Sequence, residues 1–170
     1  MGRNYQLDDA LEQINQSEQG AHHLIVYSNQ RVLRELYTRY VKTQLERENK
    51  TVLILPHYET TDSLKRGLLD ADNDNENMMK KYEDSLIVMD SIEGHFGADD
   101  HMAHVNNLVD SAENGVLVIA DAGPFFHPNK TDKLIAHELS MPSQFDINLR
   151  GFVYFIDKIL ISLQRGNGKS

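Results

Sequence analysis

Five short runs of apolar, β-favouring residues recur along the chain, and polar segments long enough to form helices separate them. The runs cover residues 22–28, 51–55, 86–89, 116–120 and 151–156. Uninterrupted apolar runs of this length are typical of strands that are buried on both faces, as in a parallel sheet. We therefore expect an α/β fold with a mostly parallel sheet of five or more strands. Right-handed crossovers would place helices on both of its faces.

The segments between the runs carry helical periodicity. Helices are predicted over residues 7–17, 30–49, 61–69, 78–84, 99–114 and 157–164. A further helix is predicted to end at residue 139. We expect a helical extension over 1–19, a single α/β domain over 20–164 and a disordered tail over 165–170.

The charge and composition exclude several partners. The formal net charge is −9 and the pI is about 5.3, so the surface repels phosphate backbones and direct nucleic-acid binding is not expected. There is no cysteine, which excludes disulfides, thiolate metal sites and a cysteine nucleophile. No apolar run approaches the roughly 20 residues that span a bilayer, so a cytoplasmic protein without membrane contact is expected.

The junction after the first apolar run has no phosphate loop. Asn29-Gln30-Arg31 leads into the long helix, with no glycine or lysine at that position. In phosphate-loop NTPases this junction carries G-x-x-x-x-G-K-[ST], whose backbone amides and lysine hold the phosphates. The chain therefore lacks the loop with which nucleotide-hydrolysing enzymes hold the phosphates. This absence favours a binding or sensing module.

Several segments resemble the MEDS domain, a sensory domain named after methanogens, methylotrophs and a dichloromethane regulator. They are G-A-H-H-L-I-V-Y from Gly20, T-V-L-I-L-P-H-Y-E-T from Thr51, V-L-V-I-A-D-A-G-P-F-F from Val116, and H-E-L-S-M-P-S-Q-F-D-I-N-L-R-G-F from His137. The resemblance covers most of the chain. Ala21 departs from it, because the family often has an acidic residue there.

The resemblance implies a RecA/KaiC-like core without its Walker A loop, a bacterial or archaeal regulator, and recognition of a small molecule. The family occurs in regulators and signalling kinases, but no helix-turn-helix or kinase segment is attached here. An output would need a signalling partner or a further part of a longer polypeptide. KaiC-like folds often assemble, so a homo-oligomer is compatible with the resemblance.

Polar and aromatic residues follow the apolar runs. In open α/β sheets, ligands bind outside the carboxyl ends of the parallel strands. The candidate ligand-binding residues at that edge are Tyr27, Ser28, His57, Tyr58, Glu59, Asp90, Asp121, Phe125 and His127. The alternative for the polar members is that they cap helices and satisfy backbone groups. Phe125 could equally fill the core or a subunit interface.

Three further hypotheses concern chemistry. Asp90 and Asp121 each resemble the Walker B carboxylate that orients magnesium, and Glu59 resembles the general base of the ATPase core. An NTPase with an atypical phosphate site is therefore one alternative. His101 and His104, at i,i+3 on a predicted helix, are weak candidates for a metal site. Together with His57, Asp90 and Asp121, these two histidines motivate a second alternative, a metal-dependent hydrolase.

The leading hypothesis is a non-catalytic sensory or regulatory domain. It would bind a small ligand or a protein partner at the strand-end edge and signal by a shift between conformations. No catalytic residue, resident metal or cofactor is predicted.

Overall fold

The computed structural model describes residues 5–17, 20–27, 29–70, 81–96, 101–126, 132 and 149–157. Its helices are α1 (Tyr5–Gln16), α2 (Gln30–Arg47), α3 (Thr61–Asp70), α5 (Ser91–Phe96), α6 (His101–Ser111) and the 3₁₀ helix η1 (Gly123–Phe126). Its strands are β1 (His22–Tyr27), β2 (Thr51–Leu55), β3 (Leu86–Val88), β4 (Val116–Asp121) and β5 (Leu149–Asp157).

The described strands form a sheet with the order β1-β5-β4-β2-β3, and every pair is parallel. From β1 to β3 the chain moves across the sheet in one direction, and from β3 to β5 it moves back. Right-handed crossovers place the helices of these two halves on opposite faces. The predicted α/β class and parallel sheet are confirmed.

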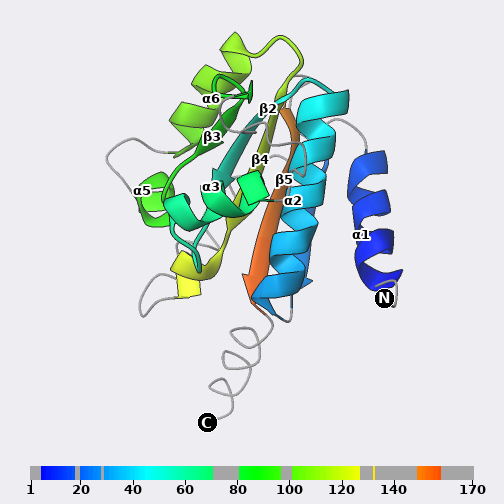
Figure 1. Ribbon diagram of the computed structural model, residues 1–170. Helices are drawn as coiled ribbons and strands as arrows, with labels where there is room; N and C mark the ends of the chain where they lie inside the picture. The colour runs from blue at the N-terminus through cyan, green and yellow to red at the C-terminus, as the bar shows by residue number, and fades with distance from the viewer. Residues whose placement is uncertain are drawn as a thin grey trace.

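Two separate cores cover the two faces. On one face, α1, α2 and α3 pack against alternate residues of the central strands, among them Val52, Ile54 and Ile119. On the other face, α5, α6 and η1 pack against the intervening residues, including Leu53, Leu55 and Val118. Figure 1 shows α1 lying beside α2, away from α5 and α6. This split follows from the two-residue alternation of a strand.

The long helix α2 follows the predicted pattern closely. Its apolar face is buried through Leu33, Leu36, Tyr37, Tyr40, Val41 and Leu45. The helix expected over 99–114 ends earlier, at Ser111, and Gly115, whose φ of 86° glycine reaches without steric cost, instead directly precedes β4.

Several details of the predicted elements differ from the structure. Residues 82–85 form a turn, whereas the expected helix ran to 84. The six-residue helix α5 was not predicted, because a single helical turn containing Gly94 carries little periodicity. Asp157, where a helix was expected to begin, is instead the last residue of β5. The expected helix near 139, the remainder of the one over 157–164 and the tail over 165–170 lie outside the described residues.

Candidate functional site

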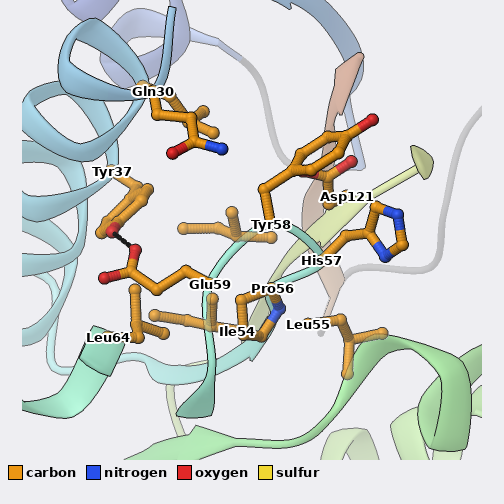
Figure 2. A pocket seen from close by; sticks show the side chains of 12 residues that line it. Gln30, Tyr37, Ile54, Leu55, Pro56, His57, Tyr58, Glu59, Leu64 and Asp121 are labelled. Atoms are coloured by element: carbon orange, nitrogen blue, oxygen red, sulfur yellow. Dashed lines mark hydrogen bonds between the residues drawn. The ribbon is translucent and has the colours of Figure 1, made fainter. Parts of the chain in front are cut away.

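A pocket opens at the carboxyl ends of β2 and β4, beneath the start of α2 (Figure 2). Its apolar floor consists of Leu33, Ile54, Leu55, Pro56, Leu64 and Ile119. Its polar and aromatic rim consists of Gln30, Tyr37, His57, Tyr58, Glu59 and Asp121. The cavity volume is about 30 Å³. Since one water molecule needs roughly 10–15 Å³ on this measure, a larger ligand requires rim side chains to move.

The topology explains why the pocket lies there. β2 continues into α3, whose Leu64 and Leu68 belong to the core with α2. The neighbouring strand β4 continues into η1, whose Phe125 belongs to the opposite core. The chain therefore leaves two adjacent parallel strands toward opposite faces, which opens the crevice where ligands of α/β sheets commonly bind.

Glu59 is held by three donors at one side of the pocket. Its Oε1 accepts hydrogen bonds from Arg34 Nη2 at 2.5 Å and from Ser63 Oγ at 2.9 Å. Its Oε2 accepts a hydrogen bond from the Tyr37 hydroxyl at 2.6 Å. Figure 2 draws this last contact, with Gln30 and Tyr37 on one side of the pocket and Tyr58, His57 and Asp121 on the other. A carboxylate with both oxygens engaged in this way is fixed in position and poorly placed to abstract a proton.

Tyr37 remains a neutral donor at ordinary pH. Its side chain is only 6% exposed. Burial raises the pKa of its hydroxyl well above the usual value near 10, and the hydrogen bond to Glu59 and the negative charge of that carboxylate raise it further.

Asp121 anchors the end of β4. Its carboxylate is 5% exposed and accepts hydrogen bonds from the Tyr27 hydroxyl at 3.2 Å and from the Gly123 amide at 2.7 Å. The His95 ring nitrogen Nε2 lies 3.2 Å from the Asp121 carbonyl oxygen. Asp121 thus connects β1, the turn into η1 and helix α5, and it borders the pocket at the same time.

The aromatic part of the rim depends on a glycine. The rings of His57 and Tyr58 pack edge to face with centroids 4.6 Å apart, and Tyr27 packs edge to face on Tyr58 at 6.5 Å. A Cβ atom on Gly123 would lie 2.1 Å from His57 Cδ2. The His57 ring can therefore occupy its place only because residue 123 has no side chain.

The amino terminus of α2 is capped by the protein itself. The Asn29 side chain accepts a hydrogen bond from the Val32 amide at 2.9 Å, and the Asn29 carbonyl accepts one from the Leu33 amide. In a phosphate loop, amides at this position face the nucleotide phosphates. The Val32 amide, one of those that a helix leaves without an intrahelical partner, is therefore already occupied here.

The structure brings five of the predicted site residues to one place. Four line the pocket, namely His57, Tyr58, Glu59 and Asp121, and Tyr27 contacts two of these. Ser28 and His127 lie outside the described residues.

Two predicted site residues lie elsewhere. Asp90 is exposed and caps α5, because its Oδ1 accepts hydrogen bonds from the Ile92 and Glu93 amides at 2.9 and 3.1 Å. Phe125 is 3% exposed and packs edge to face against His95 and Phe96. It fills the second core and does not line the pocket, which is the alternative that the sequence offered for this residue.

The metal candidates gain no support. His101 and His104 begin α6, but their side chains are not among those described. Within the described ranges, no group of three or more histidine, aspartate or glutamate side chains is placed to hold a metal ion.

The contribution of α2 and α3 to the site was not predicted from the sequence. Gln30, Leu33 and Tyr37 line the pocket, and Arg34 and Ser63 donate to Glu59. A usable signal existed. A crossover helix begins beside the carboxyl end of its strand, and positions 30, 33 and 37 share one helical face.

Comparisons with protein-family models, with curated proteins and with solved structures gave no match to this chain. Among the described helices, none is long and apolar enough to cross a membrane.

Proposed function

We propose that the chain is a non-catalytic sensory or regulatory domain that binds a small molecule in the pocket between β2, β4 and α2. The observation that carries this proposal is the position of the pocket at the crevice between two strands whose continuations diverge. An apolar floor with a few polar groups on its rim is typical of small-ligand sites.

The engagement of the carboxylates supports binding rather than turnover. Glu59, the candidate general base, has both oxygens occupied by donors from Arg34, Tyr37 and Ser63. Asp121, the candidate magnesium-orienting group, accepts hydrogen bonds from Tyr27 and Gly123. The cap formed by Asn29 stands where a phosphate loop would present its amides.

We further propose that the core is a degenerate RecA/KaiC-like one. An acidic residue ends β4 beside the pocket, as a Walker B residue would. In this proposal the ancestral nucleotide cleft serves recognition, and occupancy shifts the rim between two arrangements.

A thermal-shift screen tests the proposal. We expect at least one small metabolite to raise the melting temperature of the chain, and Mg-ATP to leave it unchanged. Gln30→Trp should abolish the shift by filling the mouth of the pocket, whereas Arg31→Trp, one position along the exposed start of α2, should retain it. A strong Mg-ATP shift that depends on Asp121 would instead favour the nucleotide-binding alternative.

A further inference from the structure

The groups around Glu59 form a site for a carboxylate that is already built. Arg34 and Ser63 donate to one oxygen and Tyr37 to the other, over distances of 2.5 to 2.9 Å. These donors belong to helices α2 and α3, whereas Glu59 lies in the segment between β2 and α3. The donor arrangement therefore does not depend on the backbone that carries Glu59.

Glu59 can leave this site without breaking a helix or strand. Residues 57–59 form consecutive bends after β2 ends at Leu55. The cap of α3 comes from Thr60, whose hydroxyl accepts a hydrogen bond from the Ser63 amide at 3.2 Å. Rotation of the Glu59 side chain toward solvent would therefore preserve both neighbouring elements.

Of the three donors, Tyr37 lines the pocket itself, whereas the half-exposed Arg34 and Ser63 reach Glu59 from outside its lining. Leu33, Ile54 and Leu64 line the pocket together with Glu59 and Tyr37. A ligand with a carboxylate head and a short alkyl chain would place its head on the donors and its chain on this floor. The space that the Glu59 side chain vacates would add to the small cavity that exists now.

We propose that the pocket binds a small aliphatic carboxylate, which displaces the Glu59 side chain from Arg34, Tyr37 and Ser63. This inference rests on the proposed function, because it assumes that the pocket is the ligand site. The Glu59 side chain then competes with the ligand for the three donors. When the ligand displaces this side chain, the segment between β2 and α3 is released and can signal that the pocket is occupied. An aliphatic amine fits less well, because it would have to replace the guanidinium of Arg34 on a carboxylate that Tyr37 and Ser63 also hold.

The tethered competitor determines how affinity should respond to substitution. A group held on a short flexible segment competes at an effective concentration on the order of millimolar or higher. Shortening Glu59 to Asp should weaken this competition, and Glu59→Ala should remove it. We expect the affinity for butyrate to rise in the order Glu, Asp, Ala, by about tenfold or more between the first and the last.

The experiment uses the full chain with sodium butyrate, butyramide and butylamine at constant ionic strength. Saturating butyrate should raise the melting temperature of Glu59→Ala by about 5 °C, because a ligand that binds only the folded state stabilises that state. Butyramide should give a much smaller shift. Glu59→Gln is the matched control, because its amide still fills the site and should keep butyrate out. Tyr37→Phe in the Glu59→Ala background should reduce the butyrate shift by removing one donor.

Equal shifts with butyrate and butyramide in Glu59→Ala, or no butyrate shift in the folded variant, would overturn the inference. Stabilisation of the native chain by butylamine that is lost in Glu59→Ala would overturn it too, in favour of an amine site. If Glu59→Ala does not fold, Glu59→Asp must show the intermediate butyrate response, and its absence counts against the inference. One further outcome would refute only the inference of a carboxylate ligand and leave the proposed function intact. In that outcome a compound from the screen gives a thermal shift that Gln30→Trp abolishes, but the Glu59 variants do not respond to butyrate.

Discussion

At the scale of single residues, the pocket depends on side chains that are held by more than one element. Glu59 joins α2 to α3 through Arg34 and Ser63. Asp121 joins β1 to the turn that leads into η1. Substituting such a residue should change stability and binding together, because the same contacts maintain the fold and shape the cavity.

Tyr37→Phe should lower the free energy of unfolding by roughly 1.5–3 kcal/mol, the range for a hydrogen bond to a charged group. The half-buried Glu59 carboxylate loses one of its donors while the ring stays packed. Urea unfolding at pH 7 measures the change. A loss below 0.5 kcal/mol would show that the hydroxyl contributes little.

The raised pKa of Tyr37 also predicts a pH dependence. The folded state keeps the phenolic proton more strongly than the unfolded chain, whose tyrosines titrate near pH 10. The stabilisation is therefore fully present below pH 10 and is lost as the pH rises toward the higher folded pKa. Over that interval the native chain should lose stability more steeply than Tyr37→Phe, by up to about 1.4 kcal/mol per pH unit. Parallel slopes in alkaline urea titrations would contradict this.

Gly123→Ala should displace the His57 ring, because the new methyl group would lie 2.1 Å from His57 Cδ2. We expect a loss of roughly 1–3 kcal/mol, as for other overpacking substitutions. The double variant with His57→Ala should recover much of this loss, so a double-mutant cycle should show strong coupling. Additive losses would mean that the clash is relieved elsewhere.

At the scale of helices and strands, two aspartates in similar sequence positions have different roles. Asp90 and Asp121 both follow apolar strands. Asp90 is exposed because β3 leads directly into α5, so its carboxylate turns to the helix amides. Asp121 is buried because it ends the central strand β4 on the face that α2 covers.

Asp90→Ala should therefore lower stability by about 1 kcal/mol, whereas Asp90→Asn should change it by less than 0.5 kcal/mol, since asparagine caps helices as well as aspartate does. Thermal or urea unfolding of the two variants measures the difference. Equal destabilisation by both would show that the charge matters more than the cap.

At the scale of the whole molecule, the sequence predicted the sheet and the edge where the pocket lies better than the walls of the pocket. The apolar runs identify β2 and β4, and strand polarity places His57 and Asp121 at one edge. The strand order is not encoded in any single run. Without that order, the positions of α2 and α3 over the crevice, and hence the roles of Arg34 and Ser63, could not be predicted.

Phe125 illustrates the same limit. Its sequence position directly after β4 is compatible with a pocket or with a core. The choice depends on the face toward which η1 turns, and that is set by contacts with His95 and Phe96 on a helix that the sequence pattern did not reveal.

We propose that the pocket between β2, β4 and α2 recognises a small molecule and not a nucleotide. Methyl NMR of the full chain tests it directly, with Ile54 and Ile119 reporting on the pocket floor and Ile87 on the opposite face. We predict that a ligand from the thermal screen shifts the Ile54 and Ile119 signals and leaves Ile87 unchanged, and that Mg-ATP shifts none of them. Saturable shifts of Ile54 and Ile119 by Mg-ATP, accompanied by steady phosphate release that Asp121→Asn abolishes, would contradict the account.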